Sequence, residues 1–159
     1  MWNTQSIKVI NSLGFESGIG ITVLSSKLED PLNFVNIYGP YQNRGPYWDK
    51  IFSKSFLKDQ QVILGGDLKF SLYFSEVWAT HVKEDPLTIF FSQKMVECNL
   101  LDIEPIKPKP NRRNNRVGDV SLAKMLDHFL IKDTLLENPL QLKQWISYGG
   151  ISDHYSNFL

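Results

Sequence analysis

Residues 60–69 have the sequence QQVILGGDLK, and this stretch decides the expected fold. The run VIL at 62–64 is apolar without alternation, which is typical of a strand covered on both faces, so we expect it at the centre of a sheet. Two glycines end the run and Asp67 follows them. A carboxylate at the carboxyl end of a buried strand is held rigidly where the next loop opens to solvent, a common place for chemistry. Lys69 then brings a cation beside this carboxylate, which is unusual for such a site.

The composition fits one globular domain. The 159 residues are 42% hydrophobic and 13% aromatic, so we expect a single domain over residues 1–159 with one sizeable core. The chain has 17 basic and 17 acidic residues, which cancel. The chain therefore has no net charge that would attract it to nucleic acid or to an anionic membrane, and any such binding must depend on a local cluster of charges.

Cysteine content and hydropathy bear on the compartment. Cys98 is the single cysteine, and its apolar neighbours predict a buried structural thiol without a disulfide partner in the chain. No stretch approaches the roughly 20 apolar residues that a membrane helix needs, and the first residues lack the blocks of a signal peptide. We therefore expect an intracellular protein with no membrane partner.

Apolar periodicity predicts an α/β arrangement around the central strand. Three runs, SIKVI, GIGITVLS and LNFVNIY, alternate apolar and polar positions between turn residues and predict an antiparallel meander. We expect a helix that begins near Pro46 and packs on this sheet, and a second helix, capped by Asp85, that begins at Pro86 and runs to about Asn99. Further strands are predicted in NLLDIEPI, KMLDHFLI, QLKQWISY and the last residues, with a helical turn at KDTLLEN.

One segment is strongly basic. Residues 105–118, PIKPKPNRRNNRVG, contain no acid and five cations, which are Lys107, Lys109, Arg112, Arg113 and Arg116. One interpretation is a solvated, mobile loop, because prolines and asparagines keep a segment out of sheets. Another is an arm that contacts nucleic-acid phosphates, since such contacts need only mobile cations near a groove. A nuclear-import signal is also compatible with this composition.

Five polar residues stand at the ends of predicted strands. They are Tyr38, Asp67, Asp127, Asp153 and His154, in NIYGP, GGDLK, LDHFLI and SDH. A mixed sheet could bring them to one rim, where carboxylates hold a hard divalent ion, a further carboxylate orients an imidazole, and polar donors grip a phosphate while water attacks in line. Each also has a structural alternative: Asp67 as a turn former, Asp127 as a polar edge position, the SDH tripeptide as a turn or cap, and Tyr38 as a core residue. Their combination in this order favours phosphodiester hydrolysis.

In this order, the motifs resemble those of the endonuclease/exonuclease/phosphatase superfamily, specifically the apurinic-type endonuclease domain of plant LINE retrotransposons. The likeness covers essentially the whole chain. VNIYGPY matches the family's N-x-Y-x-P turn, ILGGDLK its G-G-D-F-N, KMLDHFLI its R-L-D-R-F-L, and GGISDHYSNFL its closing S-D-H-x-P strand.

The resemblance implies a two-sheet α/β sandwich and a Mg²⁺- or Mn²⁺-dependent cut in a nucleic-acid backbone, of DNA or of RNA. By position, Asp67 would position the attacking water and Asp153 would hold the metal. Asp127 would orient His154 against the phosphate, which Tyr38 would also contact.

The chain departs from this family at several positions. The family has a metal-binding glutamate in a Q-E-T-K strand ahead of the first segment seen here, so the resemblance implies an amino-terminally incomplete domain that lacks its first strands. Lys69 stands where the family has asparagine; it can only donate, and it brings a positive charge close to where the metal should sit. The family's P-T-W-R tryptophan is missing from residues 110–113, and Ser156 replaces the proline of S-D-H-x-P.

From these departures we expect an impaired or inactive endonuclease domain, in which Asp67 pairs with Lys69 and metal binding is weakened. An alternative is that Lys69 turns away from Asp67 or neutralises a phosphate. Two further alternatives are a non-catalytic nucleic-acid binder that uses residues 107–116, and an incomplete domain without function.

Overall fold

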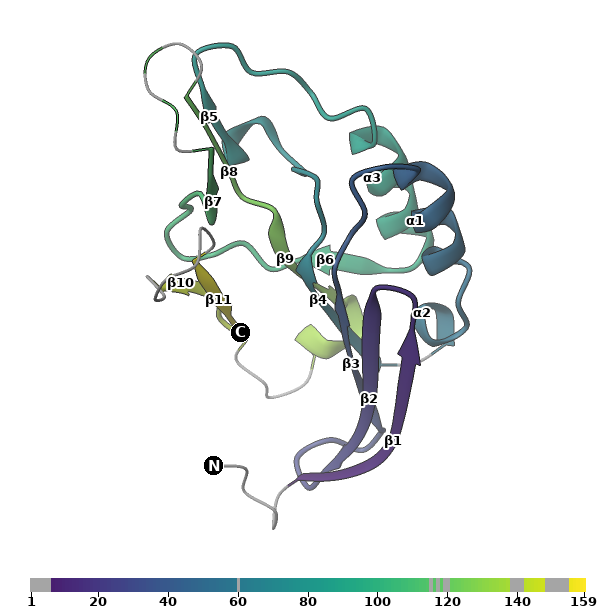
Figure 1. The fold of residues 1–159 in the computed structure, drawn as a ribbon. Coiled ribbons are helices and arrows are strands. Elements are labelled where there is room, and N and C mark those ends of the chain that lie inside the picture. Colours follow the sequence, from purple (N-terminus) through teal and green to yellow (C-terminus); the bar gives the residue numbers. More distant parts are fainter. Residues whose placement is uncertain are drawn as a thin grey trace.

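A six-stranded sheet forms the centre of the chain, which the computed structural model describes at residues 7–59, 61–114, 116, 118, 121–137, 142–147 and 155–159. The strand order is β1-β2-β3-β4-β9-β6 (Figure 1). The strands are β1 (Ile7–Phe15), β2 (Gly18–Ser25), β3 (Leu32–Ile37), β4 (Gln61–Asp67), β6 (Leu100–Asp102) and β9 (Asp127–Lys132). Helices α1 (Arg44–Phe52), α2 (Phe56–Asp59) and α3 (Thr88–Glu97) lie on one face of this sheet.

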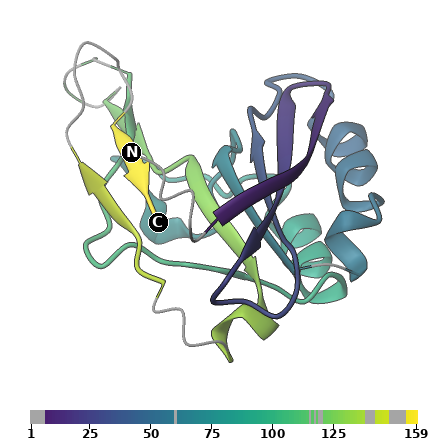
Figure 2. The ribbon, with the colours of Figure 1, turned by 90° about the horizontal axis from the view of Figure 1, so that it is seen from below.

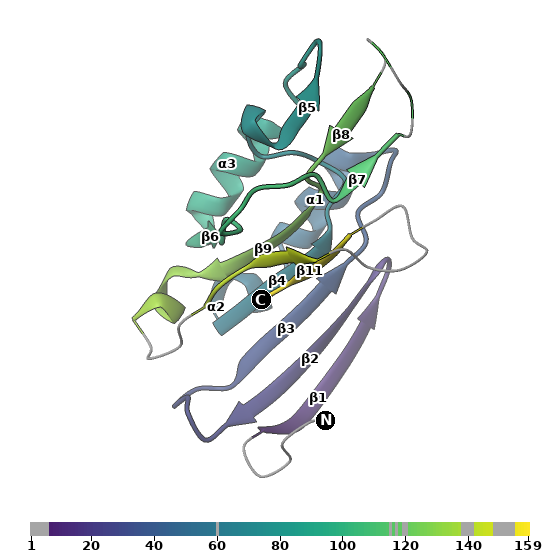
Figure 3. The same ribbon diagram turned by 90° about the vertical axis from the view of Figure 1, so that its left-hand side faces the viewer.

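Two smaller sheets lie on the side away from the helices (Figure 2). One has the order β5-β8-β7, from Val77–Ala79, Leu122–Lys124 and Arg112–Arg113; the other pairs β10 (Trp145–Ser147) with β11 (Ser156–Phe158). Figure 3 shows β10 and β11 in front of β4 and β9. Short 3₁₀ helices, η1 (Phe74–Glu76) and η3 (Asp133–Leu136), join the layers. The expected α/β sandwich is confirmed.

The central position of β4 is confirmed. It pairs in parallel with β3 and antiparallel with β9. Val62 and Leu64 belong to the core under the helices, whereas Ile63 belongs to the core on the opposite face. Because successive side chains of a strand point to opposite faces, a strand between two cores must be apolar at every position.

The two glycines of β4 allow its neighbours to approach. A Cβ at Gly65 would lie 2.6 Å from the ring of Phe129 on β9, and one at Gly66 would lie 2.2 Å from the carbonyl oxygen of Ile37 on β3. Gly66 also has a φ of 129°, which side chains rarely tolerate. The glycines therefore let three strands converge where β4 ends.

The meander β1-β2-β3 and the helix near Pro46 are confirmed. The second helix differs from the expectation, because α3 begins at Thr88 and ends at Glu97. The carboxylate of Asp85 accepts a hydrogen bond from the Leu87 amide and binds Arg44 on α1, so it fixes a turn before the helix. Cys98, directly after α3, is buried as expected, and burial raises the pKa of its thiol.

The interpretation of the basic segment as a loop that stays out of sheets is wrong at residues 112–113. Arg112 and Arg113 form β7 and pair with Lys124 and Ala123 of β8. The Asn111 and Asn114 amides continue the pairing at 3.0 Å to the carbonyls of Lys124 and Leu122. The last proline of the basic segment is Pro110, so every residue of this short strand keeps its amide donor. In the described part of the chain, no helix is long and apolar enough to cross a membrane.

We predict that Gly66→Ala destabilises the chain by more than about 2 kcal/mol, because the new side chain meets the Ile37 carbonyl in a backbone conformation that disfavours it. Gly45→Ala is the matched control, since a Cβ there meets nothing within 4 Å and α1 gains up to about 1 kcal/mol of helix propensity. Urea unfolding of both variants measures the difference. Equal stability of the two variants would contradict this account of β4.

Candidate active site

Two of the predicted carboxylates meet where the neighbouring strands β4 and β9 end and begin. This place at the strand ends, marked by Asp67 and Asp127, is called the edge below. Asp67 ends β4 and Asp127 begins β9, and the two residues are directly opposite in the antiparallel ladder. Opposed residues of such a ladder have side chains on the same face, with Cβ atoms about 5 Å apart. The Leu68 amide donates to the Leu126 carbonyl at 2.8 Å and holds the edge together. Asp67 and Asp127 therefore lie side by side, and their catalytic roles stay predictions.

Tyr38 reaches the same edge from β3. The amide of Gly39, the next residue, donates to the Asp67 carbonyl at 2.7 Å. The Tyr38 side chain is 57% exposed, so the alternative that it is a core residue is wrong. Three of the five residues predicted to form a rim thus lie together.

Lys69 is folded back onto Asp67. Its backbone is left-handed, with a φ of 61°, and its amide donates to Asp67 Oδ1 at 3.2 Å. Its Nζ forms an ion pair with Asp67 Oδ2, and the two side chains are only 1% and 8% exposed. The expected pairing is confirmed, and the alternative in which Lys69 turns away from Asp67 is wrong.

Two tyrosine rings enclose the ammonium group of Lys69. Its Nζ lies 4.2 Å from the ring centroid of Tyr38 and 4.6 Å from that of Tyr41. Burial alone would lower the pKa of Lys69, but hydrogen bonds to Asp67 and to both tyrosines raise that pKa above its usual value. The ammonium is therefore charged at neutral pH and is stabilised further by the faces of the rings.

Tyr41 and Arg112 extend this edge, and the sequence did not single out Tyr41. Arg112 Nη1 donates a hydrogen bond to the Tyr41 hydroxyl, and the guanidinium carbon lies 5.6 Å from the ring centroid. Arg112, and after it Lys69, lower the pKa of Tyr41. Arg112 thereby links the basic segment to the edge. The signal in the sequence was the GP turn in YGPY, which returns a second tyrosine close to the first.

Asn111 fastens the carboxyl-terminal chain beside Asp127. It is fully buried; its side-chain oxygen accepts a hydrogen bond from the Leu126 amide at 2.8 Å, and its carbonyl accepts one from the Tyr155 amide at 2.9 Å. Asp153 and His154 lie outside the described residues, so their roles stay predictions. Lys107, Lys109, Arg113 and Arg116 are exposed.

The described residues of this edge do not fit a Mg²⁺ ion as they stand. Mg²⁺ needs oxygen ligands in near-octahedral geometry at about 2.1 Å, but Asp67 is already bound to an ammonium group. At ~4 Å two unit charges repel by ~4 kcal/mol at an effective dielectric of ~20, and a divalent ion doubles this repulsion. Glu16 does not stand in a sequence that matches the family's metal-binding Q-E-T-K motif. Its side chain is exposed, and its Oε2 lies 3.7 Å from Lys50 Nζ.

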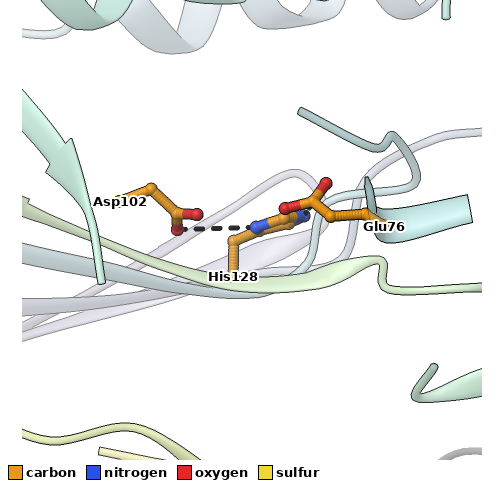
Figure 4. A group of neighbouring side chains, drawn as sticks. All are labelled: Glu76, Asp102 and His128. Atoms are coloured by element: carbon orange, nitrogen blue, oxygen red, sulfur yellow. Dashed lines mark ion pairs between the residues drawn. The ribbon is translucent and has the colours of Figure 1, made fainter. Parts of the chain in front are cut away.

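A second group of titratable side chains lies in the core behind this edge. Glu76 of η1, Asp102 of β6 and His128 of β9 each offer a ligand atom within 4.8 Å of the others (Figure 4). His128 directly follows Asp127, so strand alternation directs it to the opposite face. The sequence does not reveal this group, because its three members are far apart in the chain and carry no shared motif.

No family model and no curated protein matches the sequence. Solved structures match over most of the chain. The endonuclease domain of TRAS1, a telomere-specific non-LTR retrotransposon, has a TM-score of 0.70 and 13% identity, over 92% of this chain and 66% of its own. TDP2 of D. rerio, complexed with single strand DNA product, has a TM-score of 0.53 and 10% identity, over 95% of this chain and 66% of its own. An endonuclease/exonuclease/phosphatase family protein from Bacteroides thetaiotaomicron has a TM-score of 0.51 and 12% identity, over 98% and 62%.

Identities this low show the fold alone. The chain has the fold of these proteins, as the sequence resemblance implied, and it spans less than two thirds of the length of each.

We predict that Arg112→Ala raises the pKa of Tyr41 toward its ordinary value of 10.0, because the phenolate loses a hydrogen bond and a positive charge. Arg113→Ala, the neighbouring exposed arginine, is the control and should leave this pKa unchanged. The ¹³Cζ shifts of the tyrosines, followed by NMR against pH, measure both. An unchanged Tyr41 titration in Arg112→Ala would show that the contact does not persist in solution.

Proposed function

We propose, from the fold that this chain shares with these nucleic-acid and phosphate enzymes, that it is a divalent-metal-dependent phosphodiester hydrolase domain of the endonuclease type, of retrotransposon origin, and that it is impaired in its present form. Its substrate would be DNA, with RNA as the alternative. An intracellular location, including the nucleus, belongs to the same proposal.

The single observation that carries the proposal is the pairing of Asp67 with Asp127 at adjacent strand ends. Tyr38 and Arg112 lie at the same edge and offer a hydroxyl and a guanidinium for a phosphate oxygen. In this proposal Asp67 orients the attacking water, and Asp127 orients His154 against the phosphate. Asp153 would hold Mg²⁺ or Mn²⁺, which supplies positive charge at the phosphate when it is bound.

The impairment is proposed from Lys69. Its ammonium group forms an ion pair with the Asp67 carboxylate and is buried beneath the rings of Tyr38 and Tyr41. A carboxylate that shares its charge with an ammonium is a poorer partner for a cation or a water molecule. An asparagine at residue 69 carries no charge, so it would not neutralise the Asp67 carboxylate.

We predict that Lys69→Asn raises Mg²⁺-dependent nicking of supercoiled plasmid by at least about tenfold, in a chain to which a Q-E-T-K-bearing strand is fused ahead of Ile7. The increase should vanish in EDTA and in the double variant Asp67→Asn/Lys69→Asn. The same fusion with Lys27→Asn is the matched control, because Lys27 is an exposed lysine in the turn after β2.

Two outcomes would contradict this proposal. Efficient nicking by the unaltered chain in Mg²⁺, stopped by EDTA, would show that Lys69 does not impair it. A folded Lys69→Asn fusion that never nicks would argue against the hydrolase itself.

A non-catalytic nucleic-acid binder is the second candidate. It is favoured by the place of the basic segment, whose Arg112 reaches the edge while Lys107, Lys109, Arg113 and Arg116 stay exposed beside it. This arrangement presents several cations without a balancing acid between residues 105 and 118. Such a surface would bind phosphates without cutting them.

We predict that binding of this chain to a labelled oligonucleotide weakens steeply with salt. The triple variant Arg112→Ala/Arg113→Ala/Arg116→Ala should reduce the slope of log K against log[salt] by about 2 to 3, since each phosphate contact contributes about 0.7 to 0.9. Lys8→Ala/Lys27→Ala/Lys83→Ala removes three exposed cations elsewhere and is the control. Fluorescence anisotropy with single-stranded and duplex probes measures both. An identical slope in the two triple variants would exclude the basic segment as the binding surface.

A further inference from the structure

His128 lies between two buried carboxylates in the core behind the Asp67 and Asp127 edge. Its Nδ1 is 3.4 Å from Asp102 Oδ1, and its Nε2 is 3.8 Å from Glu76 Oε2. The imidazole is fully buried, and the two carboxylates are 2% and 5% exposed. Figure 4 shows that the carboxylates reach opposite sides of the ring. Two negative charges in such a place are unfavourable unless positive charge compensates them.

The geometry favours a proton over a metal ion as this compensating charge. One ion can bind only one of the two ring nitrogens, and the carboxylates approach different nitrogens. The three ligand atoms lie within 4.8 Å of one another, whereas the ligands of a tetrahedral zinc lie about 3.4 Å apart. Glu76 Oε2 also accepts hydrogen bonds from the amides of Leu72 at 2.6 Å and Tyr73 at 3.1 Å. An imidazolium, by contrast, carries an N–H on both nitrogens. Neither ring nitrogen makes a hydrogen bond to a described residue in this structure, so the contacts to the two carboxylates are ion pairs at 3.4 and 3.8 Å.

Among the described residues, the charged groups that act on the ring are acidic. Glu76 of η1 and Asp102 of β6 lie beside it, and Asp127 is the adjacent residue of β9, on the opposite face of the strand. Burial lowers the pKa of His128, but the adjacent Asp102 carboxylate and the other negative charges raise that pKa above its usual value of 6.5. Tyr73, from the loop before η1, lies in the field of Asp102, Glu104 and Glu76. The ring of Phe70 stacks on the imidazole at 5.7 Å and covers one of its faces.

The segments that meet at His128 also build the edge. The Glu76 carbonyl accepts a hydrogen bond from the Met125 amide at 2.9 Å, and the Leu126 carbonyl accepts one from the Leu68 amide at 2.8 Å. Asp127 follows Leu126 and precedes His128. Any movement of the imidazole relative to η1 or β6 would therefore shift the start of β9, which carries Asp127.

We propose that His128 is a positioning residue, whose imidazolium holds η1, β6 and the start of β9 together directly behind the Asp67 and Asp127 edge. This role goes beyond the proposed function, because the edge needs the same support in a hydrolase and in a nucleic-acid binder.

The role makes folding depend on pH in a defined direction. A group whose pKa is higher in the folded chain stabilises the fold fully below its unfolded pKa, near 6.5, and loses this effect as the pH rises through the folded value. Burial also raises the pKa of Glu76, so its ionisation, which begins near its ordinary value of 4.5, disfavours the fold in the same direction. Stability should fall with rising pH.

The first experiment compares urea unfolding between pH 5.5 and 9 in the parent chain, His128→Gln and His81→Gln. The parent's folding equilibrium constant should fall by up to about tenfold per pH unit above about pH 6.5, the slope for one proton. His128→Gln should lose this slope, and His81→Gln, which alters an exposed histidine, should keep it. Equal slopes in all three chains would overturn the proposal.

The second experiment needs no substitution at residue 128. In the chain labelled with ¹⁵N-histidine, the His128 signal, assigned by elimination with His81→Gln and His154→Gln, should show both ring nitrogens protonated at pH 7.5. A neutral ring would overturn the proposal. So would one equivalent of zinc that removes this signal, because the site would then be a metal centre.

Hydrogen exchange tests the positioning itself. In His128→Gln, or in the parent chain at a pH above the pKa of His128, the protection factors of the Leu68 and Leu126 amides should fall by at least about tenfold, while those of Val62 to Leu64 in the centre of β4 stay unchanged. Uniform loss of protection, or none, would show that His128 does not support the edge specifically.

Discussion

The close approach of β3, β4 and β9 at Gly65 and Gly66 is the constraint on which the rest of this structure depends. The ring of Phe129 lies over one glycine and the Ile37 carbonyl lies against the other, so no side chain fits at either position. This contact fixes the register in which Asp67 faces Asp127. In an antiparallel ladder, a slip of one residue would turn every side chain of a strand to the opposite face and would separate the two carboxylates.

The buried charges near β9 are each compensated in a different way. At its start, His128 lies between two carboxylates, and across the ladder Asp67 binds the ammonium of Lys69. At its end, Lys132 donates to the carbonyls of Cys98 at 2.5 Å and Lys58 at 3.1 Å, which close α3 and α2. Helix carboxyl ends attract cations because their last carbonyls lack amide partners. At both ends of β9, and at the end of β4 opposite its start, a charged side chain therefore contacts a group from another segment of the chain.

The fold is that of endonuclease/exonuclease/phosphatase proteins, but one fold serves nucleases and phosphatases alike, so function has to be argued from the edge. That edge combines a pair of carboxylates with a lysine that neutralises one of them. The same lysine connects Asp67 to Tyr38 and Tyr41, and Arg112 connects Tyr41 to the basic segment. The edge thus combines two acidic and two basic side chains with two tyrosine rings.

The sequence by itself determined the local elements and the members of the edge that carry a motif. Continuous apolarity placed β4 at the centre, alternation gave the meander, and strand ends identified Asp67, Asp127 and Tyr38. Only the tertiary structure decided that Arg112 belongs to a strand, that Tyr41 joins Lys69, and that His128 meets Glu76 and Asp102. Periodicity reports which face of an element is buried, a property of neighbouring residues. The identity of the partner in a buried ion pair, when that partner is distant in the sequence, depends on how the elements pack. Local sequence patterns do not contain this information.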